Sequence, residues 1–163
     1  MSDLSIRYID TPTKLEEIKT EWQTLYDQTD ASPYLSYEWI STAAEYFNRN
    51  DTWLFAVVTR QNGIMAIIPL QIVKERLFYL RLPVLRFALD GWSLQNGAIV
   101  SDQQPLLPVL HAVIRDLTMQ KYHWQYGCLS KIPKHRCGEA PEPTSGKPYV
   151  HVEIGRASCR ERV

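Results

Sequence analysis

Residues 53–73 read WLFAVVTRQNGIMAIIPLQIV, two apolar runs with a short polar turn between them. The runs Trp53–Thr59 and Ile64–Val73 are rich in aromatic and β-branched residues, which favour strands. Asn62-Gly63 supplies residues that accept positive φ, so the segment predicts a tight β-hairpin. Because neither run alternates cleanly between apolar and polar residues, we expect both faces of this hairpin to be covered, at least in part by helices.

The segments before the hairpin predict one strand and two helices. Leu4–Ile9 alternates apolar and polar residues, as does a strand with one exposed face. A capping box, Thr13-x-x-Glu16, then predicts the start of a helix of about four turns. Ser36 is a good N-cap for a second helix. The apolar stripe expected on that second helix is Trp39, Ile40, Ala43, Ala44 and Phe47.

Two prolines shape the expectation for the strands that follow. Pro69 lies inside the second run of the hairpin and cannot donate to a ladder, which predicts an edge position or a bulge where strands splay. Lys74–Arg76 is charged and predicts a turn. The strand signal of Leu77–Leu82 and Val84–Leu89 is interrupted at Pro83.

The rest of the chain adds a short strand, a helix and a last strand. Ala98–Val100 and Trp124–Leu129 are the expected strands, and Pro105 opens the helix between them. The apolar stripe of that helix is Leu106, Leu110, Val113, Ile114 and Leu117. The order of elements predicts an α/β or α+β fold, with a mixed, largely antiparallel sheet flanked by helices.

Composition narrows the class of protein. With 163 residues, 45% of them hydrophobic and 22% charged, the chain fits one soluble globular domain. A formal net charge of zero gives no reason to expect nucleic acid or an anionic membrane as partner. No apolar run approaches the ~18 residues of a spanning helix, and the first residues do not resemble a signal peptide, so we expect a cytoplasmic protein. Three cysteines in no metal or disulfide spacing predict reduced, structural thiols.

The last residues resemble a foreign sequence. Allowed codons for Ile154–Val163 spell ATC GGA AGA GCG TCG TGT AGG GAA AGA GTG, which matches a common short-read sequencing adapter. We therefore expect a domain over 1–132, a proline- and glycine-rich loop or linker over 133–152, and adapter translation over 153–163. On this interpretation the chain is the front part of a longer protein.

Three stretches together resemble one family. Trp22-x-x-Leu25 followed by Ala31–Trp39, ASPYLSYEW, is similar to a "W-x-x-L … ASPF-L-S-x-EW" segment. Ala66–Leu70 resembles the "G-x-L-V-A-V-x-P-L" strand of the same family, and Leu85–Gly91 resembles its "L-R-F-L-G" strand and loop. The family is the CelD-like acyltransferases of the GNAT superfamily, associated with cellulose and exopolysaccharide biosynthesis.

The resemblance implies a GNAT-like fold and an N-acyltransferase that uses acetyl-CoA or another acyl-CoA. The implied acceptor is an amine, with amino sugars or other polysaccharide precursors as candidates. The acyl-CoA loop of the family lies downstream of this chain. The resemblance therefore implies a missing C-terminal domain of the same chain as partner, no cofactor on this fragment, and a fragment that is inactive alone.

The best candidates for contact with a substrate are Asp90, Trp92 and Asn96. They lie in a polar loop between a predicted strand and Gly97, and loops on a rigid scaffold tend to carry function. A tryptophan there could stack on a sugar or nucleotide face while Asp90 and Asn96 supply hydrogen bonds. The alternative is that the tryptophan anchors the loop. Neither this loop nor any other stretch shows a general base with a partner, so we name no catalytic residue.

Other candidates have plainer interpretations. Ser36, Glu38 and Trp39 could line an acceptor cleft, or they could be a cap, a first-turn acid and a core residue. Arg60–Met65 comes nearest to the phosphate-loop pattern Arg/Gln-x-x-Gly-x-Gly/Ala, but it is better interpreted as a hairpin turn. The histidines, which have no metal-ligand spacing, are His111, His123, His135 and His151.

Two functions outside acyl transfer stay open. The chain could be a non-catalytic module that recognises a substrate or a partner while the missing domain performs the chemistry. It could also come from a broken reading frame and have no function. The DNA sequence beyond the adapter junction separates these hypotheses.

Overall fold

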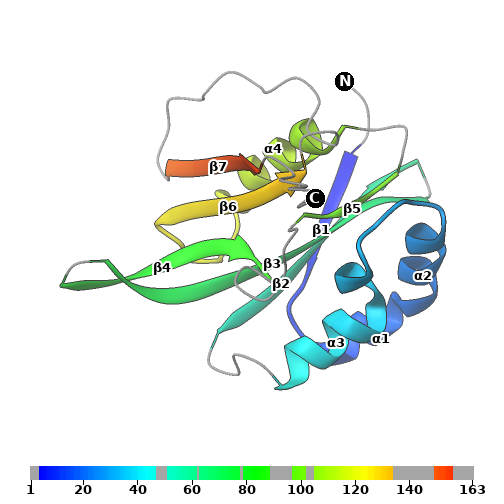
Figure 1. Cartoon of the computed structure of the whole chain (residues 1–163), viewed down its shortest axis with the longest axis horizontal. Helices are drawn as coiled ribbons and strands as arrows, with labels where there is room; N and C mark the ends of the chain where they lie inside the picture. The colour runs from blue at the N-terminus through cyan, green and yellow to red at the C-terminus, as the bar shows by residue number, and fades with distance from the viewer. Residues whose placement is uncertain are drawn as a thin grey trace, which may run out of the picture.

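The computed structural model describes residues 4–46, 51–61, 63–77, 79–88, 97–101, 105–133 and 149–155. Within them the chain forms one mixed sheet with helices on both faces (Figure 1). The strands are β1 (Leu4–Ile9), β2 (Thr52–Arg60), β3 (Gly63–Leu77), β4 (Leu80–Phe87), β5 (Ile99–Val100), β6 (Tyr126–Pro133) and β7 (Tyr149–Gly155). The helices are α1 (Pro12–Glu17), α2 (Lys19–Asp27), α3 (Tyr37–Tyr46) and α4 (Leu106–Leu117), with a short 3₁₀ helix, η1 (Pro33–Leu35).

The sheet order is β1-β2-β3-β4-β6-β7, and β5 pairs with β3 beside β4. Strands β1 to β4 pair antiparallel, whereas β6 is parallel to β4 and to β7. Helix α4 lies in the chain between β4 and β6, as a parallel pair requires a crossover connection. The expected mixed, largely antiparallel sheet flanked by helices is confirmed.

Two hydrophobic clusters cover the two faces of the β2–β3 hairpin. Alternate residues of β2, such as Leu54 and Ala56, pack with the buried side of α4. The residues between them, such as Phe55 and Val57, pack with α1, α2 and α3. Both faces are therefore dry, which confirms the expectation from the two non-alternating apolar runs.

The hairpin is confirmed, but its turn differs from the prediction. Arg60 pairs with Gly63, and the left-handed backbone conformation falls on Gln61, with φ of 51°. Gly63 does not have positive φ, and Asn62 lies outside the described residues. The β2–β3 register shifts next to the turn, between Val58 and Thr59. The turn therefore has two residues between paired positions, 61 and 62, and lies one residue earlier than the predicted Asn62-Gly63, while the register shift adds an extra residue to β3.

The first helical segment is two helices rather than one. Helix α1 ends at Glu17 and α2 begins at Lys19, with the buried Ile18 between them at φ −104° and ψ 9°. The predicted capping box at Thr13 and Glu16 is wrong: the N-cap is Thr11, and its side chain makes no capping hydrogen bond. Pro12 is well suited to the first helical position, so the helix starts before Thr13.

Helix α3 begins after Ser36 as predicted, and the Ser36 Oγ accepts a 3.4 Å hydrogen bond from the Trp39 backbone nitrogen. The prediction that Trp39 is a core residue is wrong, because its exposed fraction is 45%. The buried residues of this helix are Tyr37, Ile40 and Ala43. Residues three apart share a helix face, and a residue two positions from Tyr37 lies on the opposite side. Phe47 is not among the described residues.

Pro69 lies in an interior strand and not at the predicted edge or bulge, but the neighbouring strands separate there, as predicted. On one side it pairs with Phe55 of β2. On the other side β3 changes partner around it, since β5 pairs at Ala66 and Ile67, while β4 pairs from Leu70 onward. The proline therefore marks the place where β4 and β5 separate along β3.

Strand β4 is continuous through Pro83, and the predicted charged turn at 74–76 belongs to β3. Pro83 pairs with Lys74, and its carbonyl oxygen accepts a hydrogen bond from Gln125 just before β6. A strand residue directs its N–H and C=O to the same side, so the missing donor of Pro83 faces away from β3. The β3–β4 ladder does not need that donor, which is why the strand continues.

Helix α4 follows the prediction closely. It begins after Pro105, and four of the five predicted stripe residues are buried, with Ile114 partly buried. After it, β6 runs to Pro133, and a further strand, β7, lies where the sequence predicts linker and adapter. Any extended segment can add to an open sheet edge by backbone hydrogen bonds, so this pairing does not test the origin of residues 153–155. No helix in the described residues is long and apolar enough to span a membrane.

Candidate functional site

Four residues lie opposite one another across neighbouring strands. Trp53 of β2 pairs with Gln71 of β3, Gln71 pairs with Arg86 of β4, and Arg86 pairs with Cys128 of β6. Directly opposed residues point to the same face of a sheet. Trp53 belongs to the cluster of α1, α2 and α3, so the whole set lies on that face. We call these four residues the Gln71 row.

Gln71 is a buried polar residue in a strand of otherwise apolar neighbours. Its exposed fraction is 4%, and its Nε2 donates a 3.3 Å hydrogen bond to Asp51 Oδ2. Burial raises the pKa of the Asp51 carboxyl. Burial disfavours the ionised form of this carboxyl, so Asp51 loses its proton less readily than an exposed aspartate.

Arg86 carries the positive charge of the row. Its guanidinium forms an ion pair with Glu75, which lies on the same face of β3 four residues after Gln71. The Nε of Arg86 is buried and has no acceptor among the described residues. The same holds for Nε1 of Trp53, a residue whose exposed fraction is 9%. Buried donors without acceptors are rare in native structures, and each one calls for an explanation.

The loop predicted to contact substrate is anchored at its two described ends. The chain enters it after Ala88, whose nitrogen donates a 3.0 Å hydrogen bond to the Pro69 carbonyl oxygen, and returns at Ile99, which pairs with Ile67. Both anchors lie on β3, where β4 and β5 separate. Asp90, Trp92 and Asn96 themselves lie outside the described residues. Their role stays a prediction.

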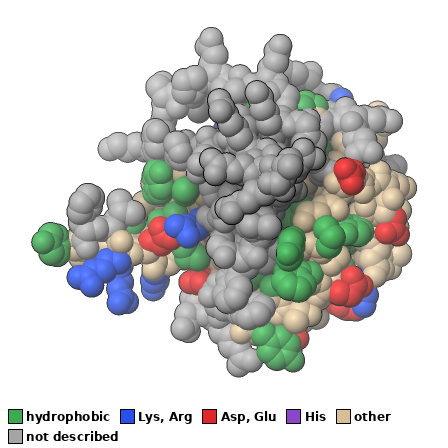
Figure 2. Space-filling model, viewed as in Figure 1, with side chains coloured by type: hydrophobic (Ala, Val, Ile, Leu, Met, Phe, Trp, Pro, Cys, Tyr) green, Lys and Arg blue, Asp and Glu red, His purple; other side chains and the backbone are tan. Residues whose placement is uncertain are grey.

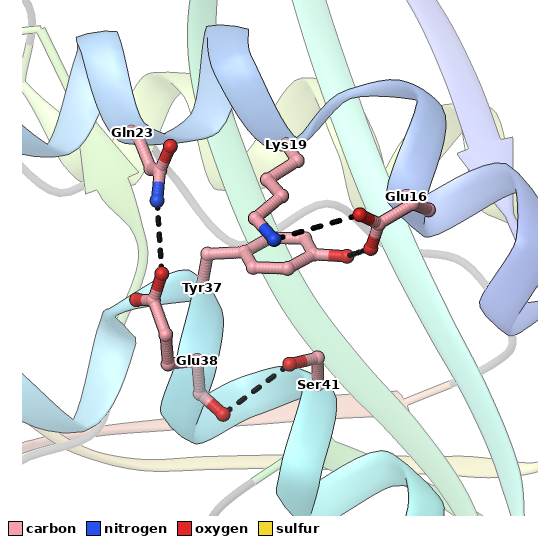
Figure 3. Close-up of polar contacts among 6 residues, drawn as sticks. All are labelled: Glu16, Lys19, Gln23, Tyr37, Glu38 and Ser41. Carbon is pink, nitrogen blue, oxygen red and sulfur yellow. Dashed lines mark hydrogen bonds and ion pairs between the residues drawn. The ribbon is translucent and has the colours of Figure 1, made fainter.

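The second predicted cluster lies among the helices (Figure 3). Glu38 Oε1 accepts a 2.8 Å hydrogen bond from Gln23 Nε2, and its backbone oxygen accepts one of 3.2 Å from Ser41 Oγ. Trp39 makes an edge-to-face contact with Tyr34, with ring centroids 5.3 Å apart. These contacts join α2 to α3 and fix the start of α3. They support the structural interpretation of Glu38.

A neighbouring contact joins α1 to α3. The Tyr37 hydroxyl donates a short hydrogen bond to Glu16 Oε2, while Lys19 Nζ lies 3.5 Å from Glu16 Oε1 and 5.1 Å from the Tyr37 ring centroid (Figure 3). The hydrogen bond from Tyr37, more than the charge of Lys19, holds the pKa of Glu16 below its usual value. Burial and this hydrogen bond raise the pKa of Tyr37. Glu16 is stabilised as an anion here, which suits an anchor rather than a proton acceptor.

No phosphate loop is found at either place where one would be expected. Arg60–Met65 joins two antiparallel strands with no helix after it, so its interpretation as a hairpin turn is confirmed. Two helices among the described residues follow a strand directly, α1 after β1 and α4 after β5. The residues before them, Asp10-Thr11 and SDQQP at 101–105, contain no glycine. A loop that cradles pyrophosphate needs glycines so that backbone N–H groups can approach the phosphate. These residues do not fit a CoA pyrophosphate.

The histidines are not brought together among the described side chains. His111 is partly buried on α4 and His123 is exposed before β6. His135 and the side chain of His151 lie outside the description. In the part of the chain that the structure describes, no group of three potential metal ligands is close enough to hold an ion.

Sequence reasoning missed the Gln71 row, although one signal was present. Gln71 interrupts the apolar run of β3, and Arg86 interrupts the apolar run of β4. A polar residue inside a strand buried on both faces requires a partner, and that requirement alone marks both positions. Which residues meet depends on strand register.

Comparisons with known proteins add little. No protein-family model and no curated protein matches the sequence. Among solved structures, the chain is similar to a GCN5-related N-acetyltransferase from Ralstonia eutropha JMP134. The two share 10% sequence identity and a TM-score of 0.39, with 90% of this chain and 98% of the other covered. A TM-score this low does not establish a shared fold.

Proposed function

We propose that this chain is the N-terminal part of a CelD-like, GNAT-type N-acyltransferase. The parent protein would transfer an acyl group from acyl-CoA to an amine, with an amine of a sugar or polysaccharide precursor as the acceptor. The observation that supports the proposal is the mixed, largely antiparallel sheet with helices on both faces, which is the fold that the sequence resemblance implies. The reduced state expected for the cysteines favours a cytoplasmic location.

The stretches that carry the resemblance fall on consecutive parts of this fold. Ala31–Trp39 forms the entry to α3 through η1, and Ala66–Leu70 spans the point where β3 changes partner. Leu85–Gly91 begins at the end of β4, on the other side of that same point. Two of the three stretches therefore meet where β4 and β5 separate, and this meeting supports a functional role for that part of the sheet.

The residues before α1 and α4 do not fit the cofactor, because neither Asp10-Thr11 nor the segment 101–105 contains a glycine. The proposal therefore assigns acyl-CoA binding to a C-terminal domain of the same chain, and we derive no chemical step from this part. Residues 1–152 alone should show no binding of acetyl-CoA by isothermal titration calorimetry. Tight binding to them would contradict the proposal.

The decisive test is the gene itself. The genomic sequence beyond codon 152 should encode a strand followed by Arg/Gln-x-x-Gly-x-Gly/Ala and a helix, and the extended protein should bind acetyl-CoA. Replacing the first glycine of that motif by a bulkier residue should abolish the binding. A continuation that lacks the motif, or an extended protein that ignores acetyl-CoA, would overturn the assignment.

A second function, a non-catalytic recognition module, is favoured by one observation. The Gln71 row presents two buried donors that have no acceptor among the described residues, and the segments before α1 and α4 lack the glycine of a phosphate loop. Such a module would bind a substrate or partner and leave the chemistry to another domain. The gene continuation separates the two functions, since the module requires no phosphate loop downstream.

A further inference from the structure

We propose that the Gln71 row binds an uncharged ligand through its hydroxyl or amide-carbonyl oxygens, which accept hydrogen bonds from Trp53 Nε1 and Arg86 Nε. The inference does not depend on acyl transfer. It rests on two buried donors, on the charges around them and on the partial exposure of the row at β4.

The unmatched atoms define what the ligand must supply. Trp53 Nε1 can only donate, and so can every nitrogen of the Arg86 guanidinium. Both are buried and lack an acceptor among the described residues. Gln71 separates them by one strand on each side, so the two donors flank a single buried amide. A molecule that satisfies both donors must present at least two oxygen acceptors, or one oxygen shared between them.

The charges around the row select against an anion. Arg86 already forms an ion pair with Glu75, which neutralises its charge. Asp51 adds a second carboxyl, held by the Gln71 amide. One cation and two carboxyl groups leave no surplus positive charge for a carboxylate or phosphate ligand. Hydroxyl and amide-carbonyl oxygens accept hydrogen bonds without bringing charge, and the hydroxyl or amide hydrogens of the same ligand could bond to Asp51.

The row has a closed end and an open end. Trp53 and Gln71 are buried, with exposed fractions of 9% and 4%. The side chains of Arg86 and Glu75 are exposed to 31% and 26%, and Cys128 beyond them is partly buried. The row is therefore most accessible at Arg86, and a ligand that enters from the β4 side must displace the side chains that cover the two donor atoms. The aromatic ring of Trp53 stacks on Phe55, with centroids 6.2 Å apart, which fixes the direction of its N–H.

Proton NMR tests the proposal directly, because indole and arginine Nε–H groups give separate signals in ¹H–¹⁵N spectra. Trp53→Phe and Arg86→Lys assign the two signals, and Arg86→Lys keeps a charge for Glu75. The probes are N-acetylglucosamine and glucose as uncharged oxygen-rich molecules, and acetate and phosphate as anions. Each is added to the ¹⁵N-labelled chain at constant ionic strength.

We expect N-acetylglucosamine to move both signals downfield along one saturable curve. The indole signals of Trp22, which donates to the Leu35 oxygen, and of Trp39, which is exposed, should stay in place. Trp53→Phe should weaken the binding that is measured at the Arg86 signal at least about tenfold, because phenylalanine has no N–H and the hydrogen bond from the indole to the ligand is lost. Trp39→Phe is the matched control and should bind as the unaltered protein does.

Three outcomes overturn the inference. Acetate or phosphate could move the two signals while the sugars do not, which would make the row an anion site. All probes could leave both signals unmoved while the Trp53 indole proton exchanges rapidly with solvent, which would mean that water alone satisfies the donors. The sugars could move Trp39 as strongly as Trp53, which would mean unspecific association.

Discussion

The backbone nitrogen of Ala88 donates a 3.0 Å hydrogen bond to the carbonyl oxygen of Pro69. The N and O of one strand residue face the same neighbour, so the ring nitrogen of Pro69 also faces the side where β4 gives way to β5. Proline can occupy an interior strand at this point because no described ladder on that side requires its donor. The backbone N–H and C=O groups of its neighbours Ile68 and Leu70 point to the opposite side, toward β2.

Pro69→Ala should therefore change the free energy of unfolding by less than about 1 kcal/mol, mostly through greater freedom of the unfolded chain. Ile68→Pro, one residue earlier, removes a donor from the β2–β3 ladder in the core and should cost about 3 kcal/mol or more. Urea denaturation of both variants measures the difference. Equal losses of unfolding free energy in the two variants would show that the backbone nitrogen of residue 69 does not differ from that of residue 68 in its hydrogen bonding.

Trp22→Phe should destabilise the helical face of the sheet. Trp22 is fully buried, and its Nε1 donates a 3.0 Å hydrogen bond to the Leu35 oxygen, which ties α2 to η1. The change removes that bond and leaves the Leu35 oxygen without its donor, so we expect a loss of about 2–4 kcal/mol. Trp39→Phe is the control, because Trp39 is half exposed, and it should stay within about 0.5 kcal/mol. Similar losses in both would contradict the structure.

Tyr8→Phe should loosen the contact between β1 and α4. The Tyr8 hydroxyl donates a 2.9 Å hydrogen bond to Asp116 Oδ2 and lies 3.1 Å from the Val113 oxygen. Burial and the Asp116 carboxylate raise the pKa of Tyr8, so the hydroxyl stays a donor across the usual pH range. We expect a loss of about 1–2 kcal/mol by chemical denaturation. Tyr79→Phe, at an exposed fraction of 94%, should leave stability unchanged.

Asp10 should contribute to stability at neutral pH and lose that contribution in acid. Desolvation opposes its ionisation, but the hydrogen bond from Tyr122 and the charges of Lys14 and Lys121 outweigh desolvation and hold the pKa of Asp10 below its usual value. A folded-state pKa below the unfolded value means that the contribution is fully present above the unfolded pKa. It disappears as pH falls through the folded pKa.

Asp10→Asn is the variant that isolates this effect. The difference in unfolding free energy between the two proteins should be constant from pH 7 to about pH 5 and should shrink below about pH 4. Other carboxyl groups titrate in both proteins and cancel in the difference. A difference that grows in acid would mean that the pKa of Asp10 is raised in the folded protein.

Arg81→Glu should stabilise the far end of the β3–β4 hairpin. Arg76 and Arg81 are directly opposed across the two strands and both are exposed, near Tyr79 and Leu80. Basic side chains gather at this projecting end in the space-filling view (Figure 2). Exchanging one of two opposed like charges for the opposite charge is worth about 0.2–1 kcal/mol. The gain should fade in high salt, and Arg81→Gln should show only part of it.

The sequence predicts this fold well wherever periodicity alone decides. The β2–β3 hairpin and α4 are predicted correctly because their apolar residues are so many that they must be buried in the core. It fails at Trp39, because a stripe drawn from apolar identity cannot tell a buried tryptophan from one on the other side of the helix. It fails at Pro83, and at Pro69 it predicts the separation of the neighbouring strands but not the interior position. Both outcomes depend on which side of the strand faces a partner, and the register decides that.

The candidate site is less predictable for the same reason. Trp53, Gln71 and Arg86 stand far apart in the chain and become neighbours only through pairing of three strands. Polarity inside an apolar run could mark Gln71 and Arg86 individually, but no spacing rule joins them. Asp90, Trp92 and Asn96 are predicted from the chemistry of their loop, and their role stays a prediction.

Strand β3 pairs with β2 from Gly63 to Ile72 on one side and with both β4 and β5 on the other. Either β4 or β5 can detach from β3 while the other strand stays paired with it. Amide hydrogen exchange should therefore be slowest at the β2–β3 amides, which open only when the whole domain unfolds. The amides that β3 shares with β5, joined over two residue pairs, should exchange through a smaller opening and at an earlier stage of denaturation.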